Sequence, residues 1–157
     1  MLIALRNHFG REIRFTYDAQ SRIAEVLPPG AVSGTGAGSA TSPIRYTYDE
    51  AASLGPGVPV RGQLSSVSWQ DGAVRRYHYE DARWPQALTG ITDEAGVRYA
   101  TYSYNDLGRV ERSEHVGGAD RVDFAYGFNA AGQATSTLTD YTGPNGAATS
   151  RSYTFDN

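Results

Sequence analysis

Residues 102–109 read Tyr-Ser-Tyr-Asn-Asp-Leu-Gly-Arg, and this stretch decides the fold because its first four residues set a pattern that recurs along the chain. The pattern is an aromatic residue, any residue, a second aromatic residue, and then Asp, Glu or Asn. Six copies hold twelve of the 2 Trp, 11 Tyr and 5 Phe residues of the chain. The copies are Phe15–Asp18, Tyr46–Asp49, Tyr77–Glu80, Tyr102–Asn105, Tyr126–Asn129 and Tyr153–Asp156.

The spacing of these copies predicts a repeat protein. Their second aromatic residues lie 31, 31, 25, 24 and 27 residues apart, within the range of about 20 to 50 residues that is typical of stacked supersecondary units. The sequence therefore predicts one array of about six repeats over residues 1–157, with long loops near 28–43 and 50–62. Because the first and last copies begin and end abruptly, we expect the chain to be a fragment of a much larger protein.

Each repeat is predicted to be a β-hairpin. In the clearest case, residues 86–92 form a strand, 93–96 a turn and 97–105 a second strand, on which Tyr102 and Tyr104 share one face because side chains alternate along a strand. A further turn over 105–109 closes the next hairpin, because an Asn side chain bonds to backbone two residues on and Gly adopts positive φ. The fold class is therefore predicted to be all-β, built from consecutive antiparallel hairpins.

The acidic or amide residue that ends each copy has a structural interpretation. Its position directly before a turn favours turn capping over a catalytic carboxylate. After the turn, apolar residues recur three apart, as in Ile23 and Val26, Leu64 and Val67, and Leu88 and Ile91. Such pairs would point to opposite faces of a regular strand, so either both faces are partly covered or a bulge resets the register.

The composition excludes several classes of function. The net charge is −3, all 14 basic residues are Arg and there is no Cys, so no basic surface points to nucleic acid and no thiolate site or disulfide is available. No apolar stretch has membrane-spanning length. The planar guanidinium of Arg suits stacking on the abundant Tyr rings, and the alternative explanation for Arg in place of Lys is coding bias in a GC-rich genome.

Catalytic motifs are also lacking. The sequence contains no nucleophile elbow and no zinc-binding His pattern, and Gly34–Gly38 lacks the Lys and the helix of a phosphate-binding loop. The histidines His8, His78 and His115 fall in different repeats, and His78 is interpreted as a sheet-surface residue. We therefore expect no enzyme activity, no cofactor and no metal. Exposed rings could stack on sugars, but Tyr–Tyr contact across neighbouring strands is the favoured interpretation.

The pattern resembles the YD repeat of bacterial Rhs proteins, a family that also includes toxin-complex C components and teneurins. The segments that carry the resemblance are Phe15–Arg22, Tyr102–Arg109 and Tyr126–Gln133, and it covers nearly the whole chain. The resemblance implies a twisted, spiralling sheet that builds a shell around a C-terminal toxin or cargo domain, with delivery by type VI secretion or related machinery. No Asp-Pro-x-Gly core that marks self-cleavage in the family is found here.

From this resemblance we expect a structural, non-enzymatic segment of a secreted or cell-surface bacterial toxin. The expected partners are the remainder of the parent shell and its cargo, with self-association through sheet edges and no nucleic acid or membrane partner. The alternative is a carbohydrate-binding repeat module that uses exposed Tyr and Arg side chains. The positions expected to define the repeat are Phe15, Tyr17, Asp18, Tyr46, Tyr48, Asp49, Tyr77, Tyr79, Glu80, Tyr102, Tyr104, Asn105, Gly108, Arg109, Tyr126, Phe128, Asn129, Gly132, Tyr153, Phe155 and Asp156.

Overall fold

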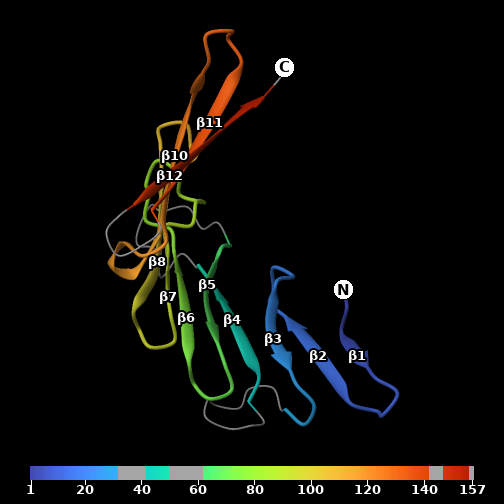
Figure 1. Ribbon diagram of the computed structural model, residues 1–157. Helices are drawn as coiled ribbons and strands as arrows, with labels where there is room; N and C mark the ends of the chain where they lie inside the picture. Colours follow the sequence, from blue (N-terminus) through green and yellow to red (C-terminus); the bar gives the residue numbers. More distant parts are fainter. Residues whose placement is uncertain (32–41, 50–61, 142–146, 156–157) are drawn as a thin grey trace. The chain divides into compact units, whose positions relative to one another are not determined.

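The computed structural model describes residues 1–31, 42–49, 62–141 and 147–155 of the chain. These residues form twelve β-strands and one three-residue 3-10 turn (Figure 1). The elements are β1 (Ala4–Arg6), β2 (Glu12–Tyr17), β3 (Ile23–Leu27), β4 (Ile44–Tyr48), β5 (Leu64–Ser68), β6 (Val74–His78), β7 (Gly90–Thr92), β8 (Arg98–Tyr104), β9 (Val110–His115), η1 (Val116–Gly118), β10 (Arg121–Phe128), β11 (Ala134–Tyr141) and β12 (Ala148–Phe155). The predicted all-β class is confirmed.

The strands follow one another in the sheet in the same order as in the chain, from β1 to β12. This order confirms the predicted series of consecutive antiparallel hairpins, while the spiral curvature stays a prediction. The chain divides into two compact units, residues 1–77 with 93–96 and residues 78–92 with 97–157. Each unit is described by itself below.

In the first unit, β2 pairs with both β1 and β3, and β4 pairs with both β3 and β5. The two long loops predicted near 28–43 and 50–62 have residues 32–41 and 50–61 outside the described part of the chain. The start of the first loop is a turn in which the Ala31 N–H donates to the Pro28 carbonyl at 2.9 Å. Its end is anchored by Ser42 and Pro43, which are fully buried.

In the second unit, β8 pairs with β7 and β9, and β10 and β11 continue the ladder to β12. Along β8, Ala100 is buried and Tyr102 and Tyr104 are half-buried, while Tyr99, Thr101 and Ser103 are exposed. The alternation confirms that Tyr102 and Tyr104 share the covered face.

The predicted strand over residues 86–92 is too long. Strand β7 covers only Gly90–Thr92, and the chain before it makes two turns, with Trp84 N–H bonded to the Asp81 carbonyl at 3.0 Å and Ala87 N–H bonded to the Trp84 carbonyl at 2.8 Å. Pro85 lacks a backbone donor for a ladder, which explains why the strand starts late.

Bulges explain the apolar residues that recur three apart. Thr16 lies opposite Glu25 but Tyr17 lies opposite Ile23, so Ala24 is the extra residue of a bulge. The same shift leaves Ser65 extra on β5, where Tyr48 lies opposite Leu64. A bulge puts residues i and i+3 on one face, so Ile23 and Val26 both lie on the face of their partners Phe15 and Tyr17. The pair Leu88 and Ile91 differs, because Leu88 lies before β7.

The buried apolar core is small. Leu27, Val67 and Ala100 are the buried hydrophobic side chains in the described ranges, with exposed fractions of 5%, 6% and 1%. Stability must therefore come largely from contacts made along the sheet by aromatic and Arg side chains, as the composition predicts.

Candidate functional site

The candidate site is the repeated turn that follows each aromatic pair. At residues 105–109, the Asn105 N–H donates to the Arg109 carbonyl and the Gly108 N–H donates to the Asn105 carbonyl, both at 2.9 Å. The Asn105 Oδ1 atom accepts from the N–H groups of Leu107 at 3.0 Å and Arg109 at 3.1 Å. One amide side chain thus satisfies two backbone donors, and the predicted capping role is confirmed here.

Two further copies build the same turn. Asp18 Oδ1 accepts from the N–H groups of Gln20 and Arg22 at 2.9 Å each, and Asn129 Oδ1 accepts from those of Ala131 at 3.0 Å and Gln133 at 2.9 Å. A fourth example, which the aromatic pattern missed, is Asn7, whose Oδ1 accepts from the Phe9 and Arg11 N–H groups at 3.0 Å each. The detectable signal was Asn followed three residues later by Gly.

The remaining copies differ from one another. Asp49 Oδ1 accepts from the Gln63 N–H, and the Asp49 N–H donates to the Gln63 carbonyl at 2.9 Å, so this residue ties together the two ends of a much longer loop. Glu80 does not cap a turn as predicted, because its longer side chain extends to Arg98. Asp81 instead accepts from the Arg83 N–H at 3.0 Å. Asp156 lies outside the described residues.

Tyrosine hydroxyls form a second recurring contact that the sequence reasoning missed. The hydroxyls of Tyr17, Tyr48 and Tyr104 donate to the carbonyls of Leu2 at 2.6 Å, Ile23 at 2.9 Å and Leu88 at 2.8 Å. Each acceptor lies at or just before the start of the preceding strand, so each hydroxyl braces a hairpin across its backbone. Desolvation raises the pKa values of Tyr48 and Tyr104, which keeps their hydroxyls protonated as donors.

The fifth copy moves this brace by two residues. Its second aromatic residue is Phe128, which has no hydroxyl, and the Tyr126 hydroxyl donates to the Val110 carbonyl at 2.9 Å instead. The sequence signal for this contact was which of the two aromatic positions of a copy holds Tyr, because Phe has no hydroxyl to donate. These contacts also correct the expectation of Tyr–Tyr stacking for Tyr17, Tyr48, Tyr104 and Tyr126, whose hydroxyls reach backbone carbonyls.

Arginine completes two of the braces. The guanidinium carbon of Arg22 lies 4.2 Å from the centre of the Tyr48 ring, and the Tyr48 hydroxyl bonds to the next carbonyl, that of Ile23. Arg109 lies 5.2 Å from the centre of the Tyr126 ring, and the Tyr126 hydroxyl bonds to the next carbonyl, that of Val110. We call this arrangement the Arg–Tyr clasp. It ties the turn of one copy to the aromatic strand of the next copy, and it bears out the expected stacking of Arg on Tyr.

Ion pairs between strands engage other charged groups. Arg45 pairs with its cross-strand partner Glu25 at 3.1 Å, and Arg112 pairs with its cross-strand partner Asp123 at 2.8 Å. The Arg121 guanidinium also bonds to Asp123. The hydrogen bond from Arg121, helped by Arg112, lowers the pKa of Asp123 to about 2. The Asp123 carboxylate is therefore an ionised partner of Arg, without the raised pKa expected of a general acid.

The closest approach to a catalytic arrangement lies around His78. Its Nε2 atom is 2.7 Å from the Thr92 hydroxyl, and its Nδ1 atom is 3.8 Å from Glu80, beyond hydrogen-bond distance. Glu80 is held by both terminal nitrogens of Arg98, at 3.0 and 2.9 Å, and the Arg98 bonds lower its pKa. Since the carboxylate faces Arg98 and not the imidazole, the group does not form a nucleophile–base–acid triad. His78 is half-buried and bonds across two strands.

The other two histidines make different contacts. His115 stacks on Tyr99 with ring centres 4.8 Å apart and lies 3.0 Å from Asp120, and His8 contacts Phe9. Over the described ranges, no group of three His, Cys, Asp or Glu side chains is arranged to hold a metal ion. No membrane-spanning helix occurs there either.

Residues 81–88 form a loop that the predicted repeat unit did not include, and this loop covers the turn of residues 105–109. Trp84 Nε1–H donates to the Asn105 carbonyl at 2.9 Å, and its ring lies directly over Gly108. Arg83 pairs with Asp106 at 2.6 Å and donates to the Tyr104 carbonyl at 2.9 Å. Residues 81–88 thus pack onto the turn of residues 105–109.

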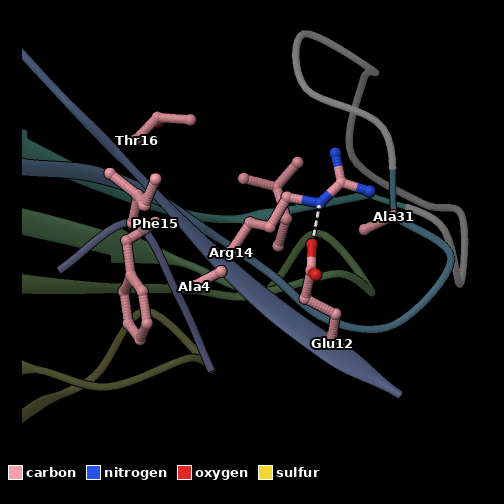
Figure 2. A pocket seen from close by; sticks show the side chains of 8 residues that line it. Ala4, Glu12, Arg14, Phe15, Thr16 and Ala31 are labelled. Atoms are coloured by element: carbon pink, nitrogen blue, oxygen red, sulfur yellow. Dashed lines mark ion pairs between the residues drawn. The ribbon is translucent and has the colours of Figure 1, made fainter. Parts of the chain in front are cut away.

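A shallow depression of about 710 Å³ is lined by residues of β1, β2 and β3 together with Ala31. Figure 2 shows the Arg14 guanidinium turned toward Glu12, with the Phe15 ring apart from this ion pair. The pair measures 2.8 Å, and the Arg14 side chain is 65% exposed. The two charged side chains of the pocket are therefore paired with one another.

The aromatic residues of the predicted pattern occupy the same position in each hairpin. Every described copy of the aromatic pair lies at the C-terminal end of an even-numbered strand, β2, β4, β6, β8, β10 or β12, with Tyr79 directly after β6. Successive copies therefore lie one hairpin apart in the strand order. No protein-family model matches the chain, and a search of curated proteins finds no significant match.

Proposed function

We propose that this chain is a structural, non-enzymatic segment of a β-hairpin repeat wall, of the kind with which Rhs proteins enclose a toxin or cargo domain. The observation that carries the proposal is the Arg–Tyr clasp, which links one copy to the next. A contact that ties successive units serves the continuity of an array, because each repeat in such proteins is stabilised by its neighbours.

The use of the chemically versatile side chains supports the same proposal. Asp18, Asn105 and Asn129 cap turns, and the hydroxyls of Tyr17, Tyr48 and Tyr104 bond to backbone. These groups are engaged in holding hairpins together. As part of a shell, the segment would act in a secreted or surface-displayed bacterial protein, with the neighbouring repeats and the cargo as its partners.

The alternative of a carbohydrate-binding module rests on exposed rings, and two variants separate the two functions. Tyr104 is half-buried and braces β7, whereas Phe128 is 78% exposed. For a wall, Tyr104→Ala should lower the urea midpoint strongly and Phe128→Ala should leave it unchanged, with no binding of the wild-type chain to a glycan array. Glycan binding that Phe128→Ala abolishes while the fold is kept would favour the module and overturn the wall.

The coding sequence on either side of this segment gives an independent test. Further copies of the aromatic pattern are expected there, together with a region of different composition that encodes the cargo. Flanking sequence without a single further copy would contradict the proposal.

A further inference from the structure

One face of strand β11 has a low centre between two rows of larger side chains. Residues that lie directly opposite one another in an antiparallel ladder share a face of the sheet. On this face, the small residues Ala134 and Ser136 of β11 have aromatic residues opposite them on both neighbouring strands. These are Phe128 and Tyr126 on β10, and Phe155 and Tyr153 on β12. Neither ladder has a register shift, so the rows stay aligned, and we call this face the β11 strip.

The aromatic rings of the β11 strip are open to solvent. The exposed fractions are 78% for Phe128, 55% for Phe155 and 49% for Tyr153. The Tyr126 hydroxyl is held by the Val110 carbonyl, whereas the Tyr153 hydroxyl has no hydrogen bond among the described residues. A strand added beside β12 would lie in the plane of the sheet, so further repeats there would leave this face open. Exposed rings gathered in this way mark a site of interaction.

A polar pocket lies farther along the same strip. It has a volume of about 160 Å³ and is lined by Leu138, Asp140, Thr149 and Arg151. Leu138 lies opposite Arg151, and Asp140 lies opposite Thr149, so all four continue the face of Ser136. Within the described ranges, neither the Asp140 carboxylate nor the Arg151 guanidinium has an ion-pair partner. The pocket therefore offers hydrogen-bond acceptors and donors together, with no net charge.

The dimensions of the β11 strip fit a single extended chain. From Ala134 to Asp140 the strip is about 20 Å long, because a strand rises about 3.4 Å per residue. The flanking strands β10 and β12 are two strand spacings, or about 9–10 Å, apart. An α-helix with its side chains is about 10–12 Å across, too wide to lie between the two rows of rings. A polyproline II segment of about six or seven residues covers the length of the strip, at about 3.1 Å per residue.

We propose that the β11 strip binds a proline-rich peptide in the polyproline II conformation. Proline-rich segments dock onto aromatic-lined surfaces with a small loss of entropy, because their conformation is already formed. The backbone of such a segment has no internal hydrogen bonds, so its carbonyls accept from Arg151 and from the Tyr153 hydroxyl, and an N–H of a residue other than Pro donates to Asp140. One acid and one base in the pocket favour this neutral backbone over an acidic or a basic peptide. Binding at this face is independent of the wall proposal, which concerns contacts between successive hairpins.

Titration of the full chain with a fluorescent polyproline peptide of about ten residues, long enough to span the strip, tests the site. Phe128→Ala should weaken binding at least about tenfold, because one row of rings loses its most exposed member. The matched control is Phe9→Ala, which removes a ring of the same 78% exposure outside the strip and should leave the Kd unchanged. A Gly–Ser peptide of equal length should bind at least about tenfold more weakly, because it is flexible and has no proline rings. No measurable binding of the polyproline peptide, or equal losses in the two Phe variants, would overturn the proposal.

Two-dimensional NMR of the natural chain gives a readout that does not depend on the folding of a variant. The peptide should shift the amide signals of residues 134–140 on β11 and leave those of β1 unchanged; shifts confined to other strands would overturn the site. Arg151→Leu should weaken binding more than Arg151→Gln, which keeps a donor in the pocket, and circular dichroism checks that both variants are folded. Displacement of the peptide by a soluble oligosaccharide would identify the strip as a carbohydrate site and overturn the peptide. A failed titration leaves the Tyr104→Ala test of the wall unaffected.

Discussion

Two glycines in equivalent turns allow a sharp test of how the loop of residues 81–88 stabilises the sheet. Gly108 and Gly132 have nearly the same backbone conformation, with φ of 72° and 78°. A side chain costs about 1–2 kcal/mol in this left-handed region. Ala at either position should therefore lose this amount of stability through backbone strain alone.

The two sites differ in the space around them. A Cβ atom on Gly108 would lie 3.1 Å from Trp84 Cε3 and 3.2 Å from Cδ2 and Cζ3, whereas one on Gly132 would have no neighbour within 4 Å. The indole cannot move freely, because its Nε1–H bonds to the Asn105 carbonyl at 2.9 Å. Overpacking of this kind costs a further amount of about 1–3 kcal/mol. We expect Gly108→Ala to lose about 2–5 kcal/mol and Gly132→Ala about 1–2 kcal/mol.

The assay is urea unfolding followed by circular dichroism at 25 °C, with both variants repeated in a Trp84→Ala background. Removing the indole should bring the cost of Gly108→Ala down to that of Gly132→Ala, because only the backbone strain remains. The difference between the two backgrounds is the coupling energy of the double-mutant cycle. Equal losses for the two glycine variants in the natural background would refute the packing of Trp84 on this turn.

Three further predictions concern the capping, bracing and charge contacts. Asn129→Ala should destabilise the chain by about 0.5–2 kcal/mol, because two backbone donors lose their acceptor. Asn129→Asp should keep the stability, because Asp18 makes the same turn. Equal losses of stability in the two variants, measured by urea unfolding, would contradict the capping role. Tyr104→Phe should cost about 0.5–1.5 kcal/mol by leaving the Leu88 carbonyl without its donor, and thermal unfolding should show a smaller loss for Tyr102→Phe, its neighbour on the same face. The pKa of Asp123 is about 2, below the ordinary value of 3.8 for Asp, so its ionised form adds stability that is present above pH 4 and lost as the pH falls toward 2. Asp123→Asn should therefore lower the urea midpoint at pH 7 and flatten the fall of that midpoint between pH 4 and 2. An unchanged fall at acid pH would refute the pairing with Arg121 and Arg112.

The fold was largely predictable because it depends on local signals. The aromatic pair, the Asx residue and the Gly of residues 102–109 each specify a strand end or a turn without reference to distant parts of the chain. The predicted strand of residues 97–105 matches the bounds of β8 to within one residue at each end. The strand before it was predicted too long, because the apolar residues Leu88 and Ile91 outweighed the turn formed around Trp84 and Pro85.

The contacts of the candidate site were less accessible from the sequence. The partner of the Tyr104 hydroxyl lies 16 residues away and that of the Tyr48 hydroxyl 25 residues away, and their identity depends on the strand register. That register is itself changed by the bulges at Ala24 and Ser65. Apolar residues spaced three positions apart are compatible both with a bulge and with burial on both faces of the strand. Periodicity alone does not distinguish the two, because it does not show which backbone positions pair.

The distribution of bulges follows the repeat. Bulges occur where the second aromatic residue meets the next strand in the hairpins β2–β3, β4–β5 and β8–β9, whereas the β10–β11 and β11–β12 ladders run through eight positions each without a shift. Bulges increase local twist and discourage further pairing. The hairpins that carry the Tyr17, Tyr48 and Tyr104 braces are therefore adapted to their own neighbours.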